Sequence, residues 1–198
     1  MIRFINLNRD APYLKFKQEF KRAVNAGQNI VEAMSVASYS ASHNEVNARF
    51  VNLKYVDDKE FIFFSNYQSP KSKDFLNHEQ VSTLFYWDST NVQIRIKGTI
   101  KKTSKEFNSN YFKNRDKKKN ALAISSKQSS KIISYEAVKK NYLECLKNQD
   151  LDVCPDFWGG FSITPYYFEF WEGHTSRINK RVSYELIDGS WEIFYLQP

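Results

Sequence analysis

The chain has 198 residues, of which 41% are hydrophobic and 26% charged, a composition that predicts one globular domain and excludes a disordered or low-complexity chain. Lys and Arg number 29 against 22 Asp and Glu, and this net charge of +7 favours an anionic partner, whether nucleic acid, a membrane surface or a phosphorylated small molecule. The two cysteines, Cys145 and Cys154, are too few for a disulfide scaffold. Because the first ten residues lack the apolar core of a signal peptide and no segment approaches the ~18 apolar residues of a membrane span, we expect a cytoplasmic protein.

The N-terminal half is expected to begin with a helix and to continue mainly as strands. Pro12 suits the first turn of a helix over Pro12–Ala26, Phe16 and Phe20 lie on its apolar stripe, and Gly27 suits its end. Alternating or continuous apolar runs then predict strands, interrupted by one short helix that starts at Ser69 and Pro70. In chain order these are Met34–Ser40, Val46–Tyr55, Glu60–Ser65, the helix Ser69–Asn77, Val81–Trp87 and Val92–Lys102.

The C-terminal half is expected to hold helices first and strands last. The expected elements are a helix over Ser104–Asn114, a basic linker over Arg115–Asn120, a helix over Ser134–Asn148, strands over Phe161–Ile163 and Tyr166–Trp171, and a hairpin of Arg181–Ile187 and Ser190–Leu196. The strands do not alternate with helices. This predicts a mainly β, antiparallel barrel with flanking helices, as one domain over 1–198 with an N-terminal helical segment over 1–28.

Standard catalytic motifs are absent from the sequence. His43, His78 and His174 are far apart, and no Cys-x-x-Cys pair is present, so we expect no metal site. No glycine-rich phosphate loop or nucleophile elbow occurs. Cys145 falls on the apolar face of its expected helix, where a small buried hydrophobe is the simpler interpretation than a nucleophile.

Basic side chains recur along the expected strands and near their ends. They include Arg49, Lys54, Lys71, Arg115, Arg177 and Arg181. Such residues usually form a solvated face, but several of them converging would match the oxygens of a phosphate group. The residues alone leave both interpretations open.

The order of several short segments resembles the pyridoxamine 5′-phosphate oxidase family, over about residues 30 to 198. Each segment is weak evidence alone, and their shared order carries the resemblance. The segments are Arg49–Lys54, Phe63–Lys71, Leu84–Trp87, Val92–Gly98, Tyr111–Arg115, Ser126–Ser129, Phe157–Phe161, Glu169–Gly173, Arg177–Arg181 and Leu196–Pro198.

The resemblance implies a Greek-key-like split β-barrel that forms a homodimer with FMN at the subunit interface. It implies oxidation of pyridoxamine or pyridoxine 5′-phosphate to pyridoxal 5′-phosphate, with oxygen reoxidising the flavin. The implied FMN contacts are Arg49, Lys54, Phe64, Ser65, Lys71, Gln93, Gln128, Ser129, Trp158 and Arg181. The implied substrate contacts are Lys54, Tyr111, Arg115, Lys119, Arg177 and Asn179, of which Arg177 and Asn179 would be catalytic.

These residue types suit the implied roles. Arg49 and Lys71 are cations that match a phosphate dianion, and Gln93 offers both a donor and an acceptor to the polar edge of a flavin ring. Trp158 would supply a flat apolar wall. The flavin would perform the hydride chemistry while the protein orients the reactants.

Some positions depart from the family's pattern. Pro70 stands where the family has an arginine, and Lys119 stands where it has a serine. Asn179 replaces a histidine, and the neighbouring Lys180 replaces an acidic residue. The FMN set is therefore mostly kept and the substrate set is half altered.

Two functions other than a vitamin B6 oxidase are also compatible with the sequence. One is a split-barrel flavoprotein that acts on a different small substrate. The other is a basic β-barrel that binds nucleic acid through Lys101, Lys102, Lys105, Lys113 and Lys117–Lys119. Because acidic residues are interspersed with these lysines, we expect neither a nucleic acid nor a membrane as partner.

Overall fold

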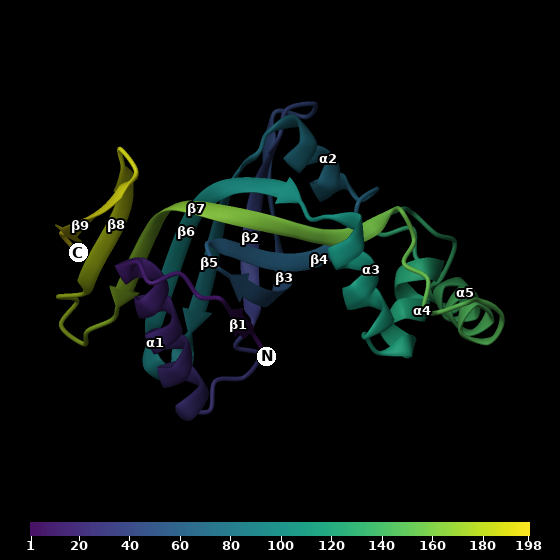
Figure 1. Cartoon of the computed structure of the whole chain (residues 1–198), viewed down its shortest axis with the longest axis horizontal. Coiled ribbons are helices and arrows are strands. Elements are labelled where there is room, and N and C mark those ends of the chain that lie inside the picture. Colours follow the sequence, from purple (N-terminus) through teal and green to yellow (C-terminus); the bar gives the residue numbers. More distant parts are fainter.

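One nine-stranded sheet runs through the whole chain, and the computed structural model describes residues 1–198 (Figure 1). The strands are β1 (Arg3–Ile5), β2 (Ala33–Ser40), β3 (Glu45–Asp57), β4 (Glu60–Asn66), β5 (Gln80–Trp87), β6 (Val92–Lys102), β7 (Trp158–Glu172), β8 (Lys180–Ile187) and β9 (Ser190–Leu196). The helices are α1 (Ala11–Asn25), α2 (Pro70–Asn77), α3 (Lys105–Lys113), α4 (Lys117–Ser125) and α5 (Tyr135–Asn148), with a 3-10 turn over Asp88–Thr90.

Six of the strands close into an antiparallel barrel. The sheet order β3-β2-β5-β6-β7 becomes a ring because β4 pairs with both β3 and β7. Strands β2, β3 and β4 follow one another, and β5 returns to lie beside β2, which is a Greek-key arrangement. The expected mainly β, antiparallel barrel is therefore confirmed.

Aromatic side chains fill the core of the barrel and the gap beneath α1. Phe61 and Phe85 are almost fully buried, and the ring of Phe16 from α1 lies 5.0 Å and 5.3 Å from theirs. Burial of each ring of this size contributes about 1.5–3 kcal/mol to the stability of the fold. The apolar stripe expected on the first helix thus docks that helix on the barrel.

The N-terminal segment 1–28 is not only helical, as the sequence had indicated. Arg3–Ile5 forms β1, which pairs in parallel with β3 and sets Arg3 opposite Tyr55. A strand of three residues is too short to show an alternating pattern, so it has no signature in the sequence.

The prediction of a basic linker over Arg115–Asn120 is wrong. Lys117–Ser125 forms α4, and the Asp116 side chain caps it by accepting a hydrogen bond from the Lys119 backbone N–H at 3.1 Å. The run of lysines hides the helix because α4 has almost no apolar face. The cap at Asp116 was the available signal.

The two strands expected over Phe161–Ile163 and Tyr166–Trp171 are one continuous strand, β7. Pro165, which lacks a backbone donor, lies between the two expected ranges. The pairing with β6 shifts by one residue between Lys97 and Gly98, where Pro165 sits opposite Gly98. This bulge accommodates the proline without ending the strand.

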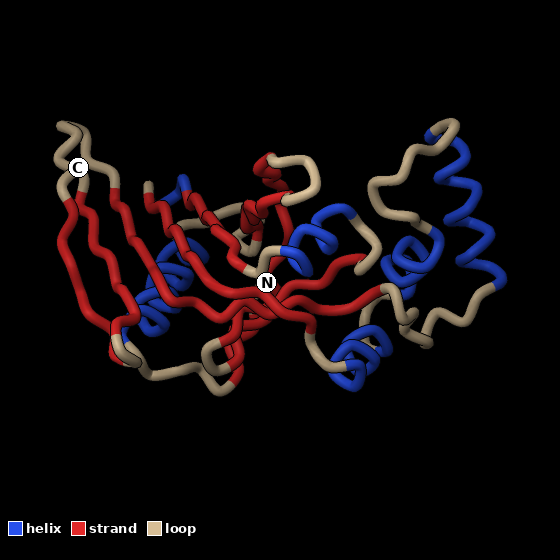
Figure 2. The backbone as a smooth tube through the Cα atoms, turned by 90° about the horizontal axis from the view of Figure 1, so that it is seen from above, coloured by secondary structure: helices blue, strands red, loops and turns tan.

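Helices α3, α4 and α5 lie at one end of the molecule, and the β8–β9 hairpin lies at the other, joined by the length of β7 (Figures 1 and 2). Asn108 fastens α3 to β7, because its side-chain oxygen accepts from the Gly160 N–H at 2.8 Å. A Cβ on Gly159 would collide with Asn108 and Tyr67. The Gly159–Gly160 pair therefore permits close packing of α3 against β7.

Candidate cofactor and substrate site

Lys71, in the first turn of α2, is a buried cation without an acidic partner. Its ammonium group donates hydrogen bonds to Ser65 Oγ at 3.1 Å, Ser69 Oγ at 3.0 Å and Gln128 Oε1 at 3.1 Å. Burial and the nearby positive charge of Arg49 lower the pKa of Lys71 to about 8. A desolvated cation that contacts only neutral acceptors is prepared to receive an anion.

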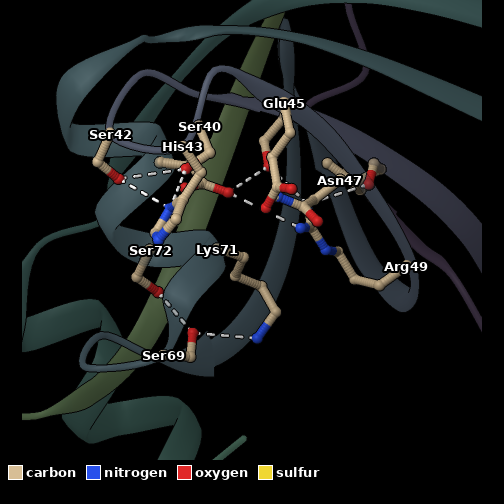
Figure 3. Close-up of polar contacts among 12 residues, drawn as sticks. Ser40, Ser42, His43, Glu45, Asn47, Arg49, Ser69, Lys71 and Ser72 are labelled. Carbon is tan, nitrogen blue, oxygen red and sulfur yellow. Dashed lines mark hydrogen bonds and ion pairs between the residues drawn. The ribbon is translucent and has the colours of Figure 1, made fainter.

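Arg49, on β3, lies near Lys71 (Figure 3). It forms an ion pair with Asp74 of α2. One guanidinium nitrogen donates to Ser38 Oγ at 2.7 Å, and another lies 3.8 Å from Asp74 Oδ2. Ser38 in turn donates to Asp74 at 2.9 Å. Burial lowers the pKa of Arg49, while the Asp74 charge opposes that shift. The two cations are thus arranged in advance, and Asp74 offsets part of their charge.

A stack of parallel aromatic rings borders this cradle. The Phe64 ring lies 3.7 Å from that of Tyr111 at an angle of 7°, and 5.2 Å from that of Trp158 at 10°. The Arg115 guanidinium lies 5.0 Å from the centre of the Trp158 ring. Trp158 is therefore already covered on one face by Phe64 and approached by a cation, and this stack is an apolar wall beside polar donors.

Arg115 is positioned by Asn120, a buried residue of α4. One nitrogen of Arg115 donates to Asn120 Oδ1 at 3.1 Å and to the Lys119 carbonyl at 2.8 Å. The Asn120 amide nitrogen donates to the carbonyls of Phe112 and Leu151, both at 2.8 Å. Asn120 thereby joins α3, α4 and the segment before β7, and keeps the guanidinium in place.

Cavities connect the cradle with the residues expected to bind substrate. One of about 190 Å³ is shared by Ser65, Lys71 and Gln128 with Lys54, Tyr111 and Arg115. A larger one of about 770 Å³ continues to Arg3 and Lys119. The structure thus brings together one group of expected site residues, the α2 group: Arg49, Lys54, Phe64, Ser65, Lys71, Tyr111, Arg115, Lys119, Gln128 and Trp158.

Gln93 and Arg181 belong to a second group, at the opposite end of β7. Gln93 pairs with Trp171, and Trp171 pairs with Arg181, so the three lie in one row across β6, β7 and β8. Trp171 follows Trp158 by 13 positions on β7, which corresponds to roughly 40 Å along an extended strand. A ligand of ordinary size cannot touch both groups within one chain.

Glu169 fixes Arg181 in this row. One of its carboxylate oxygens accepts from two nitrogens of Arg181 at 3.0 Å and 2.8 Å, and the other accepts from Arg95 and Tyr167. Burial would raise the pKa of Glu169, but hydrogen bonds from Arg181 and Tyr167 and the charge of Arg95 lower it. The buried carboxylate therefore stays ionised and holds the guanidinium through two charge-assisted hydrogen bonds to one of its oxygens.

The remaining expected residues lie outside the α2 group. Arg177 and Asn179 sit in the loop between β7 and β8, where Arg177 is exposed and the Asn179 side-chain oxygen accepts from the His174 N–H at 3.0 Å. Ser129 lines a separate hollow of about 350 Å³ against α5, although its neighbour Gln128 contacts Lys71.

Several residues that contact or adjoin the expected site residues were not predicted from the sequence. Trp171, and not Trp158, is the flat side chain beside Gln93. This neighbour of Gln93 can be identified only once β7 is known to pair with β6. Asp74, Asn120 and Glu169 position the expected arginines, and only their contacts across distant segments mark them out.

The lysines that would form a nucleic-acid surface are partly neutralised. Lys101 pairs with Glu60 at 2.7 Å, Lys105 pairs with Asp156 at 3.0 Å, and Lys117 pairs with Asp152. None of the helices has the length and apolar composition to cross a membrane. Cys145 is buried, as its place on the helix face indicated.

Comparison with known proteins agrees with this architecture. The family pattern described as "Pyridoxamine 5′-phosphate oxidase" matches residues 20–147, and that described as "Pyridoxine 5′-phosphate oxidase C-terminal dimerisation region" matches residues 158–198. The pyridoxine/pyridoxamine 5′-phosphate oxidase of Rippkaea orientalis is 37% identical over 196 residues, which cover 98% of this chain and 92% of that protein. The chloroplastic enzyme of that name from Arabidopsis thaliana is 34% identical, over 94% of this chain and 36% of its own length.

Solved structures share the fold. PhzG from Burkholderia lata, solved with tetrahydrophenazine-1-carboxylic acid, superposes with a TM-score of 0.89 at 24% identity, covering 94% of this chain and 92% of its own. A pyridoxamine 5′-phosphate oxidase-related, FMN-binding protein from Nostoc punctiforme gives 0.79 at 12% identity, over 96% and 99% of the two chains. The family match over residues 20–147, the similarity to the Rippkaea oxidase along nearly all of both chains, and the split-barrel fold make this chain a member of the pyridoxamine 5′-phosphate oxidase family of oxidoreductases.

Proposed function

We propose that this chain is an FMN-dependent oxidase that converts pyridoxamine or pyridoxine 5′-phosphate to pyridoxal 5′-phosphate, with oxygen as the electron acceptor. The observation that carries the proposal is the α2 group. In it, a buried cation without an acidic partner adjoins a cavity lined by Lys54, Tyr111 and Arg115. The relatives at 34–37% identity carry the name of this activity.

FMN fits the residues of the α2 group. Lys71 and Arg49 supply positive charge for the phosphate, and Ser65 and Gln128 supply neutral polar groups next to Lys71. These are the partners that a buried phosphate needs. When bound, the flavin ring accepts and passes on a hydride equivalent. Lys54, Tyr111 and Arg115 would hold the phosphate of the substrate and so orient it.

A homodimer with FMN at the interface is supported by the distance between the two groups of site residues. The row Gln93–Trp171–Arg181 also includes Tyr86, which pairs with Gln93. Leu84 shares this outer face of the sheet, two residues before Tyr86, and Phe50 lies on it next to Ser35 of β2. Phe50 is 76% and Tyr86 56% exposed in the single chain. An exposed apolar face around a row of site residues favours a second copy there, whose α2 group would complete the site.

Arg177 and Asn179 would act on substrate from this second side. Their loop adjoins β8 and the row that holds Arg181. Arg177 would lie across the substrate ring. Asn179 would form hydrogen bonds, but its amide does not take up or release a proton near neutral pH.

The function is tested by the visible absorption of the FMN-saturated, desalted protein, kept free of oxygen. Adding pyridoxamine 5′-phosphate is expected to bleach the flavin band, and admitting oxygen is expected to restore it while pyridoxal 5′-phosphate forms. A band that persists would show an FMN protein with another substrate, and the absence of any retained flavin would refute the cofactor assignment.

A different small substrate is the second candidate. Lys119 and Asn179 alter the substrate side while the phosphate cradle around Lys71 is kept. The similarly folded PhzG was solved with tetrahydrophenazine-1-carboxylic acid, and the fold therefore accommodates ligands other than B6 vitamers. The bleaching experiment separates the two candidates.

FMN affinity is expected to depend on pH through Lys71. The free protein holds Lys71 with a pKa of about 8, and the phosphate binds best to the protonated form. Because the phosphate is a dianion only above its own second pKa of about 6, affinity should be greatest near pH 7 and fall as pH rises through 8. Titration by flavin fluorescence checks this, with riboflavin as a control that lacks the phosphate. Equal FMN affinity about one unit below and one unit above pH 8 would contradict the role of Lys71.

Asn179→His is expected to raise turnover on pyridoxine 5′-phosphate, because an imidazole can exchange a proton near neutral pH. We expect a gain of about tenfold, which is smaller than the ~100- to 10,000-fold that a well-positioned general acid or base contributes. Asn179→Gln, which keeps the amide chemistry, is the matched control and should show no gain. If the histidine variant is no faster, Asn179 does not limit this activity.

A further inference from the structure

The loop between β7 and β8, residues 173–179, carries Arg177 in an unusual backbone conformation. Arg177 has a φ of +61°, in the left-handed region that side chains other than glycine rarely adopt. Its side chain is exposed and forms no hydrogen bond or ion pair within the chain. The direction of the guanidinium therefore depends on the backbone of the turn, and the contacts that hold this turn also position Arg177.

His174 is the residue on which the hydrogen bonds of this turn converge. Its carbonyl accepts from the Arg177 N–H at 2.9 Å, and its ring Nδ1 accepts from the Ser176 N–H at 3.1 Å. Its own N–H donates to Asn179 Oδ1 at 3.0 Å. One residue is thus bonded to three later positions of the loop, and one of these bonds is made by its side chain.

The ring of His174 occupies the position that an asparagine side chain has in an Asx turn. In such a turn the side-chain oxygen accepts from the backbone N–H two residues on, and His174 Nδ1 makes the same contact with Ser176. A neutral imidazole that accepts at Nδ1 carries its proton on Nε2. Because the contact needs only an acceptor at this position, asparagine can replace histidine here and alanine cannot.

Gly173 fixes where this turn begins. Its N–H donates to the Asn91 carbonyl at 3.0 Å, and a Cβ on Gly173 would collide with the Asn91 side chain. Asn91 directly precedes β6, whose second residue is Gln93. The turn is therefore built against the end of the row that contains Gln93, Trp171 and Arg181.

We propose that His174 is a positioning residue, whose ring holds the turn that presents Arg177 to the substrate. The assignment of Arg177 to the substrate rests on the proposed function. Without the Nδ1 acceptor the turn would populate other conformations, and substrate would bind only to the fraction that keeps Arg177 in place. Apparent affinity falls in proportion to that fraction, while the bound complex, and with it kcat, stays nearly the same.

The test compares His174→Ala with His174→Asn in the FMN-saturated full chain. Loss of one neutral hydrogen bond corresponds to about a two- to tenfold change in an equilibrium constant. His174→Ala should therefore raise KM for pyridoxamine 5′-phosphate by that factor and change kcat by less than about twofold, and His174→Asn should restore the parental KM. Amide hydrogen exchange gives a readout without turnover, because the Ser176 and Arg177 N–H groups should lose protection in His174→Ala and keep it in His174→Asn.

Thr175→Ala is the matched control. Thr175 is exposed in the same loop, and its side chain forms no hydrogen bond within the chain. This variant should match the parent in KM and in amide exchange. The positioning role is overturned if His174→Ala keeps the parental KM, if His174→Asn is no better than His174→Ala, or if Thr175→Ala loses as much. A chain that shows the expected amide exchange but oxidises no pyridoxamine 5′-phosphate would keep the turn and refute only the proposed function.

Discussion

Lys71→Met is expected to lower FMN affinity by on the order of 100-fold, because the phosphate loses a charged partner. One hydrogen bond to a charged group contributes about 1.5–3 kcal/mol. The apo protein should be as stable as the parent or more so. The folded chain lowers the pKa of Lys71 from 10.5 to about 8, which costs about 3 kcal/mol while the amine is charged. This cost is present in full below pH 8 and disappears as pH rises towards 10.5, and methionine removes it at every pH.

Riboflavin binding and thermal unfolding serve as the controls for Lys71→Met. Riboflavin lacks the phosphate, so its affinity should change by less than about twofold. Flavin fluorescence gives both affinities, and a melt of the apo protein gives the stability. Equal losses for FMN and riboflavin would show that Lys71 supports the fold of the site and not the phosphate itself.

Mixing two defective variants is expected to restore flavin sites if the interface arrangement is right. Lys71→Met damages the α2 group, and Arg181→Gln damages the row on β6, β7 and β8, while glutamine can still donate to Glu169. In a heterodimer one site would receive the intact half from each chain. Random pairing makes half of the dimers heterodimers, so about a quarter of the parental sites should return.

Co-expression of the two variants with different purification tags, followed by flavin quantification, gives this fraction. The control pairs Lys71→Met with Arg49→Ala, which damage the same half and should restore nothing. If the Lys71→Met and Arg181→Gln pair restores nothing either, the two groups of residues do not form one flavin site across two chains, and the interface site is refuted.

Much of the fold was predictable because its signals are local. Alternation over Val92–Lys102 and the Asp188-Gly189 turn lie within a few residues of the elements they specify. The exceptions have physical reasons. β1 is too short for a period, α4 lacks an apolar face, and Pro165 interrupts the pattern of β7 without interrupting the strand.

By itself the sequence determined the barrel class, through strands that do not alternate with helices, and it indicated the candidate cations through the order of short segments around Arg49, Lys71 and Arg181. Only the tertiary structure decided which of them meet. It separates Arg181 from Lys71 by the length of β7, sets Trp171 beside Gln93, and holds the two arginines through Asp74 and Glu169. Strand register and long-range side-chain pairs depend on contacts between segments far apart in the chain, and no local pattern encodes them.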